Sequence, residues 1–207
     1  MIKRIFLASA ALILGAATSF GAQIAIQNNN APVLIGDMGG TAVPGGNFVT
    51  VGSFDTLDNA AIEALVASGD PANIAAAFNQ FGTATDFATA DANGLPGIFV
   101  AEIAAGIAAD SPLVGDDIFI VAGEGSGVGT ATSVAIFRST TQFNFDDPAF
   151  GASLGLAADF ETVVGTPMDV SIPGGPTIAG VAVVPVPEPS SMLLVALGAA
   201  LGLRRRR

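Results

Sequence analysis

Short apolar runs separated by turn residues fill most of the chain and predict β-strands. The early runs QIAIQ, APVLIG and GNFVTVGSF are bounded by glycine, proline and asparagine, as strands usually are. Later runs rich in phenylalanine, isoleucine and valine repeat the pattern: IFVAEIAAGI, DDIFIVAG, TSVAIFRST, TQFNFDD, TPMDVSIP and GPTIAGVAVV. Most connections between runs are too short for a helical crossover, which favours antiparallel pairing.

One stretch between these runs changes to the helical period and predicts a helical hairpin. Asp58 is a good N-cap and Gly69 a stop for the first helix, and Asp70 followed by proline caps a second helix that ends at Gly82. The apolar stripe of the two helices consists of Ile62, Leu65, Val66, Ile74, Phe78 and Phe81. We expect this stripe to pack on a sheet.

These elements predict one folded domain over residues 23–184. It is mainly β, an antiparallel sandwich-like domain with one inserted helical hairpin. The chain contains no cysteine, so the domain must be stable without disulfides. No clean fixed-period repeat interrupts the pattern, which argues against a solenoid.

The N-terminus has the three regions of a secretory signal peptide. Lys3 and Arg4 form a positive segment, an apolar run covers 5–17, and small residues follow up to Gln23. The sequence therefore predicts a signal peptide over residues 1–22 and export of the remainder.

Charge is distributed very unevenly along the 207 residues. Of the 7 lysines and arginines, six are Lys3, Arg4 and Arg204 to Arg207. Residues 23–189 therefore contain one cation, Arg138, against all 18 acids, a net charge of −17. Such a polyanion repels nucleic acid and anionic lipid, so no nucleic-acid partner is expected. We expect Arg138, on a predicted strand, to pair with an acid.

The missing residue types exclude most catalytic chemistry. The chain has no His, Cys, Trp or Tyr, which excludes Ser-His-Asp and Cys-His catalysis and His- or Cys-based zinc sites. No Asp-Thr-Gly or Asp-Ser-Gly triplet is present. The glycine run 123–129 lacks the spacing of a phosphate loop and is followed by a strand pattern. We predict that the protein is not an enzyme and has no cofactor.

Structural calcium stays open as an alternative because many acids lie near predicted turns. The segment DFATADANG brings Asp86, Asp91, Asn93 and Gly94 close in sequence, but it does not fit the EF-hand spacing. The pairs Asp116-Asp117 and Asp146-Asp147 offer further oxygens. No single metal site is predicted.

The C-terminal 23 residues combine three elements in order. Pro185, Pro187 and Pro189 keep the chain extended. Residues 192–203 are then apolar or glycine, and four arginines, Arg204, Arg205, Arg206 and Arg207, follow at once. A helix over 190–203 would be about 21 Å long, shorter than the ~30 Å core of a bilayer. The arginines act as a positive-inside stop, so a short transmembrane helix is predicted.

This order of elements resembles the PEP-CTERM sorting signal of Gram-negative bacteria, with Pro187, Glu188 and Pro189 as the motif. The resemblance implies that residues 185–207 are a sorting and anchor segment. It implies an exosortase, a membrane cysteine protease, as partner, and transient residence in the inner membrane. It also implies delivery to the cell surface or the extracellular space, often alongside exopolysaccharide and biofilm production.

Two functions are therefore expected. The first is an exported, non-catalytic surface or extracellular-matrix protein that carries a signal for exosortase processing, with exopolysaccharide as a possible contact. The alternative is a β module that binds calcium or polysaccharide at the cell surface.

Overall fold

The structure is a computed structural model that describes residues 22–28, 33–87, 96–105, 111–144 and 151–187. In the N-terminal half, the elements are β1 (Ala22–Gln27), β2 (Leu34–Gly36), β3 (Phe48–Ser53), α1 (Asn59–Ala67), α2 (Pro71–Ala77), β4 (Asn79–Asp86) and β5 (Val100–Ala105). The following elements are β6 (Asp117–Glu124), the 3-10 helix η1 (Val128–Thr130), β7 (Ser133–Gln142), β8 (Gly151–Gly155) and α3 (Leu156–Asp159). The last are β9 (Phe160–Val164), β10 (Thr166–Ser171), β11 (Thr177–Ala182) and β12 (Val184–Pro185).

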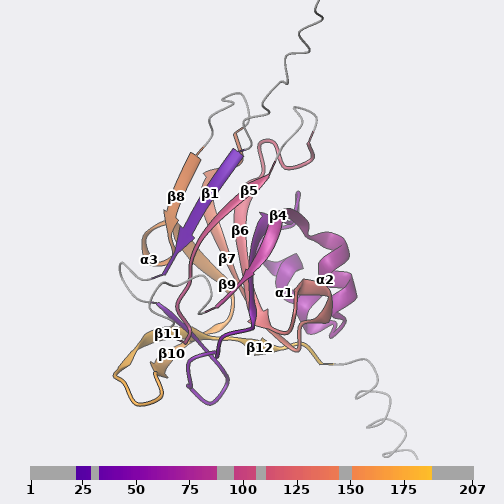
Figure 1. Ribbon diagram of the computed structural model, residues 1–207. Helices are drawn as coiled ribbons and strands as arrows, with labels where there is room; N and C mark the ends of the chain where they lie inside the picture. The colour runs from indigo at the N-terminus through magenta and orange to yellow at the C-terminus, as the bar shows by residue number, and fades with distance from the viewer. Residues whose placement is uncertain (1–21, 29–32, 88–95, 106–110, 145–150, 188–207) are drawn as a thin grey trace, which may run out of the picture.

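The described strands form three sheets (Figure 1). The central sheet has six strands, with the order β12-β7-β6-β3-β4 and with β9 also pairing with β7. The two other sheets have three strands each, in the orders β5-β1-β8 and β10-β11-β2. The prediction of a mainly β fold is confirmed.

The central sheet is buried on both faces, and its sequence explains why. In β6, Ile118 and Ile120 lie in one core, whereas Phe119 and Val121, which alternate with them along the strand, lie in another. Successive side chains of a strand point to opposite faces, so a continuous apolar run such as DIFIVAG requires cover on both sides. The two covers come from different parts of the chain.

A second sheet covers one face. Ile24 and Ile26 of β1, Ile103 of β5 and Leu154 of β8 share a core with Ile120 and other residues of the central sheet. Burial of this shared apolar surface fixes the β5-β1-β8 sheet against the central sheet. The two sheets do not close into one.

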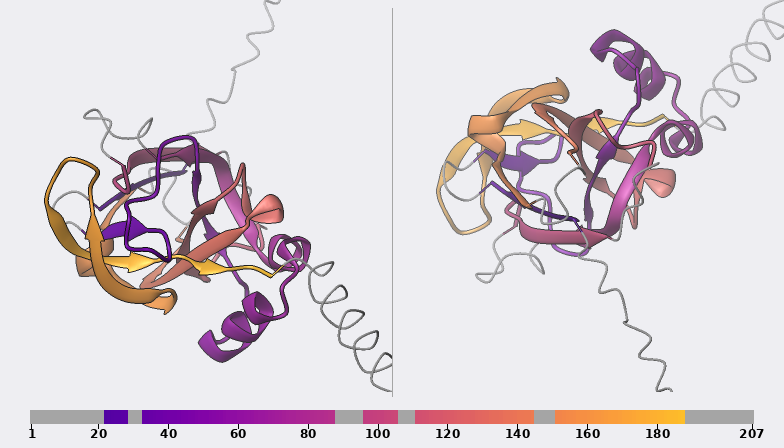
Figure 2. Two further views of the ribbon diagram at one scale, coloured as in Figure 1. Left: turned by 90° about the horizontal axis from the view of Figure 1, so that it is seen from below. Right: turned by 90° about the horizontal axis from the view of Figure 1, so that it is seen from above.

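The helical hairpin covers the other face, as the sequence predicts. Asp58 accepts a hydrogen bond from the N–H of Ala61 at 2.8 Å, and Asp70 accepts one from the N–H of Ala72 at 2.9 Å. These caps satisfy N–H groups that a helix leaves free at its first turn. Buried residues on the inner faces of the two helices pack on the sheet: Ile62, Val66 and Ile74. Figure 2 shows the hairpin on the side of the molecule opposite the β10–β11 ribbon.

The second predicted helix is shorter than expected. α2 ends at Ala77, and Phe78 is extended with φ −100° and ψ 111°. Phe78 lies in the core between the hairpin and the sheet, but Phe81 lies in β4 and belongs to the core on the opposite face of the sheet. The helix-like spacing of these rings is therefore a coincidence. The strand β4 begins at Asn79, inside the predicted helix, and continues past the predicted end of that helix at Gly82 as far as Asp86.

The sequence patterns also missed four short elements and two pairings. β8, α3, β9 and the 3-10 helix η1 had no prediction, and the runs TSVAIFRST and TQFNFDD share one strand, β7. Antiparallel pairing holds for seven of the nine pairings among the described strands but is wrong for β1–β8 and β2–β11, which are parallel. The partners of each parallel pair are far apart in sequence. Short connections restrict only strands that follow one another.

The predicted transmembrane helix falls on residues outside the described ranges. Among the helices that the structure describes, none has the length and apolar character needed to cross a membrane.

Phe54 connects the hairpin to the central sheet and offers a test of the fold. Its ring centroid lies 5.0 Å from that of Phe78 and 5.2 Å from that of Phe119, and its side chain is fully buried. Phe54→Ala should lower the free energy of unfolding by about 3–5 kcal/mol, because a cavity remains between the layers. Urea denaturation measures the change.

Met38→Ala is the matched control, since Met38 is 60% exposed. Its effect should stay within about 0.5 kcal/mol. Equal effects of the two substitutions would contradict the assigned layers.

Candidate functional site

The chain leaves the folded domain through β12, which is held to the sheet by backbone hydrogen bonds. Val184 and Pro185 pair antiparallel with Val134 and Ser133 of β7. The N–H of Val186 then donates to the carbonyl of Thr132 at 2.9 Å. The fold therefore continues to the residue before Pro187.

Side chains alternate along this last strand. Val186 is 4% exposed and lies in the core under the hairpin, whereas Pro185 and Pro187 face solvent. Proline has no N–H to donate, so it is tolerated only at the edge of a sheet. β12 is such an edge strand. The pattern of valine and proline therefore fits a strand with one buried face.

Gly69, just after α1, is in contact with Pro187. It ends α1 with φ +78°, a conformation that favours glycine. A Cβ at this position would lie 2.5 Å from the carbonyl oxygen of Pro187 and 3.3 Å from its Cβ. Pro187 therefore lies directly on the C-terminal end of α1, where no larger residue than glycine fits.

A groove opens beside Pro187. Its volume is about 530 Å³, and it lies between α1, the end of β9 and β12. Glu63, Val66 and Ala67 of α1 line it, and so does Pro187 itself. The walls are mostly apolar, with Glu63 as the charged lining residue.

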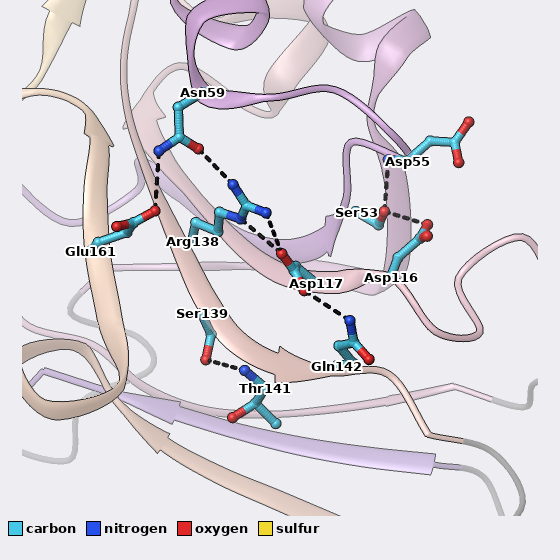
Figure 3. A network of polar contacts seen from close by, with 10 residues as sticks. All are labelled: Ser53, Asp55, Asn59, Asp116, Asp117, Arg138, Ser139, Thr141, Gln142 and Glu161. Atoms are coloured by element: carbon cyan, nitrogen blue, oxygen red, sulfur yellow. Dashed lines mark hydrogen bonds and ion pairs between the residues drawn. The ribbon is translucent and has the colours of Figure 1, made fainter.

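A polar cluster surrounds Arg138 on the face of β7 (Figure 3). Arg138 Nη2 lies 2.6 Å from Asp117 Oδ2, and Nε donates to the same oxygen at 2.8 Å. Arg138 Nη1 donates to Asn59 Oδ1 at 3.0 Å, and Asn59 donates in turn to Glu161 at 3.1 Å. The predicted pairing of Arg138 with an acid is confirmed. The cluster connects the start of α1 to β6, β7 and β9, which is a structural role.

The acid pairs proposed as calcium ligands do not converge where the structure describes them. Asp116 accepts a hydrogen bond from Ser53 Oγ at 2.6 Å, while Asp117 binds Arg138 (Figure 3). In the described ranges, no group of three or more acidic side chains could hold a metal ion. Asp86 ends β4. The other candidates, Asp91, Asn93, Gly94, Asp146 and Asp147, lie outside the described residues.

Of the predicted sorting residues, the structure describes Pro187. Glu188, Pro189 and the four arginines from Arg204 to Arg207 lie outside the described residues. The sequence patterns did not identify Val186, Gly69 or Thr132 as the residues that hold the junction. The alternation of valine and proline at 184–187 was the one available signal.

Comparison with known proteins bears on the tail alone. Residues 185–207 match the family model of the PEP-CTERM protein-sorting motif, which confirms the resemblance drawn from the sequence. The domain that precedes the motif has no family assignment. No curated protein and no solved structure matches the chain.

Arg138→Gln tests the structural role of the polar cluster. The side chains of Arg138 and Asp117 are 33% and 19% exposed, so solvent screens the pair only in part. We expect the free energy of unfolding to fall by about 1–3 kcal/mol. Arg138→Lys should lower the free energy of unfolding by a smaller amount, because lysine keeps the positive charge. Some loss should remain, because lysine lacks the planar fork that reaches both partners.

A double-mutant cycle of Arg138→Gln with Asp117→Asn should give a coupling energy above about 0.5 kcal/mol. Strictly additive effects would mean that the pair contributes nothing.

Proposed function

We propose that this chain, whose residues 185–207 carry a PEP-CTERM sorting motif, is an exported and non-catalytic protein of the cell surface or extracellular matrix. The match of the tail to the sorting motif carries the proposal. Motifs of this family are signals for exosortase, and they imply export and membrane anchoring before processing. The non-catalytic role and the final location at the cell surface or in the matrix go beyond this match and are proposed.

Each segment has its own step in the proposed course of events. The signal peptide of residues 1–22 directs export. The apolar run 192–203 and the arginines that follow it hold the chain in the inner membrane, with the arginines on the cytoplasmic side. Exosortase recognises Pro187-Glu188-Pro189 and removes the tail. The domain then reaches the cell surface or the extracellular space.

The chemistry of the domain supports a non-catalytic role. The chain lacks His, Cys and Tyr, and the one cation of residues 23–189, Arg138, is bound to Asp117 and Asn59. The acid groups Asp116 and Asp117 hold neighbouring elements together rather than face each other across a cleft. A net charge of −17 keeps such a protein soluble outside the cell.

A calcium- or polysaccharide-binding module is the second proposal. It rests on the excess of acids over bases in residues 23–189 and on segments 88–95 and 145–150, which contain Asp91, Asp146 and Asp147.

A calcium titration separates the matrix-protein proposal from a calcium-binding module. A bound ion stabilises the folded state by RT ln(1 + [L]/Kd), about 2.7 kcal/mol at a hundredfold excess over Kd. The matrix-protein proposal predicts the same melting temperature in millimolar CaCl₂ and in EDTA, at equal ionic strength. A melting temperature that rises with CaCl₂ but not with MgCl₂ would favour the binding module instead.

Glu188→Ala tests the proposed processing. The intact mass of the protein recovered from its native host should show the wild-type chain ending close to residue 189. The variant should retain residues up to Arg207 and stay in the membrane fraction.

Glu102→Ala, the same chemical change on the exposed face of β5, is the control and should be processed like the wild type. Processing that is equally efficient in both variants would contradict recognition of the motif.

A further inference from the structure

The groove beside Pro187 and the sorting motif are continuous. Pro187 is the first residue of the motif and also a wall of the groove. Its carbonyl lies against Gly69 at the end of α1, and Val186 before it is buried and hydrogen-bonded. A protein that binds Pro187 therefore also contacts α1 and the end of β9.

The length of chain beyond Pro187 reinforces this constraint. Four residues, 188–191, separate Pro187 from the apolar run that begins at Met192. Fully extended, the chain from Pro187 to Met192 spans about 17 Å. The headgroup layer on one side of a bilayer takes up about 5–7 Å of that distance. With the tail in the membrane, the domain is held close to the membrane surface, with the groove beside the point of attachment.

We propose that the groove between α1, β9 and β12 is a docking surface for the membrane protease that cleaves the tail. The inference rests on the proposed function, because it requires that the tail be membrane-held and processed. The protease recognises the motif as part of the folded domain and not as a free peptide.

The lining of the groove indicates what the protease presents to it. Val66, Val163 and Val164 offer an apolar floor, and Glu63 offers a negative charge. An apolar side chain next to a lysine or arginine complements these walls. A largely apolar cleft of this volume takes one or two such side chains.

Ala67 provides the sharpest test because it lies in the groove and is exposed. Ala67→Arg places a long side chain across the groove. Ala64→Arg is the matched control: it makes the same change on the same helix at an exposed residue that does not line the groove. We expect A67R to be processed about tenfold more slowly than A64R, as when one central interface residue is lost.

The rates are measured in the native host by pulse-chase, with the full chain and the intact mass of the product. Melting temperatures of both variants should equal that of the wild type, since both positions are exposed. Glu63→Lys is a second groove variant, should A67R fold poorly. It should also slow processing, because it reverses the charge at the groove.

A flexible spacer between the domain and the motif should make the rate of processing independent of the groove. Ten glycine and serine residues inserted between Val186 and Pro187 move the motif away by about 17 Å on average. In this background, A67R and A64R should be processed at the same rate. A groove effect that survives the spacer would overturn the inference.

The remaining outcomes separate this inference from the proposed function. If A67R and A64R are processed like the wild type, the docking surface is wrong but processing stands. If the wild-type chain is itself not processed, the proposed function fails. If A67R lowers the melting temperature of the full chain but not of a chain that ends at Pro187, the chain's own tail fills the groove, and the inference is overturned.

Discussion

Burial of the central sheet on both faces is the constraint on which the structure depends. Strands β3, β6 and β7 bury consecutive residues, and therefore side chains on both faces, so neither face of the sheet can be left in water. The β5-β1-β8 sheet covers one face and the hairpin of α1 and α2 covers the other. The hairpin depends on the sheet in turn, because nine- and seven-residue helices are too short to be stable alone. Arg138 then fixes the start of α1 to the strands beneath it.

The same constraint determines where the chain leaves the domain. β12 takes the edge of the central sheet, and Val186 completes the core beneath the hairpin. Gly69, at the end of α1, leaves just enough space for Pro187. The packing that stabilises the domain therefore also holds the first residue of the sorting motif. The domain thus positions the first residue of its own sorting motif.

Local signals in the sequence predict much of this fold, and long-range contacts account for the rest. The caps at Asp58 and Asp70 and the apolar runs of β3 and β6 depend on neighbouring residues, and those predictions are confirmed. Phe81 was assigned to a helix because its spacing from Phe78 fits both a helix turn and a strand after a bend. The parallel pairs β1–β8 and β2–β11 and the contact of Gly69 with Pro187 join distant segments, and no local pattern encodes them. The tail motif was predictable because its three elements are contiguous.

Amide hydrogen exchange at Val186 tests most directly whether the fold runs into the sorting motif without a spacer. The N–H of Val186 donates to the carbonyl of Thr132 at 2.9 Å, and the side chain is 4% exposed. Its exchange in the full chain should be slowed to within about tenfold of that of Val121 in the central sheet, since both open only with the core. Exchange of Val186 at the rate of an unstructured peptide, with Val121 still protected, would contradict this account.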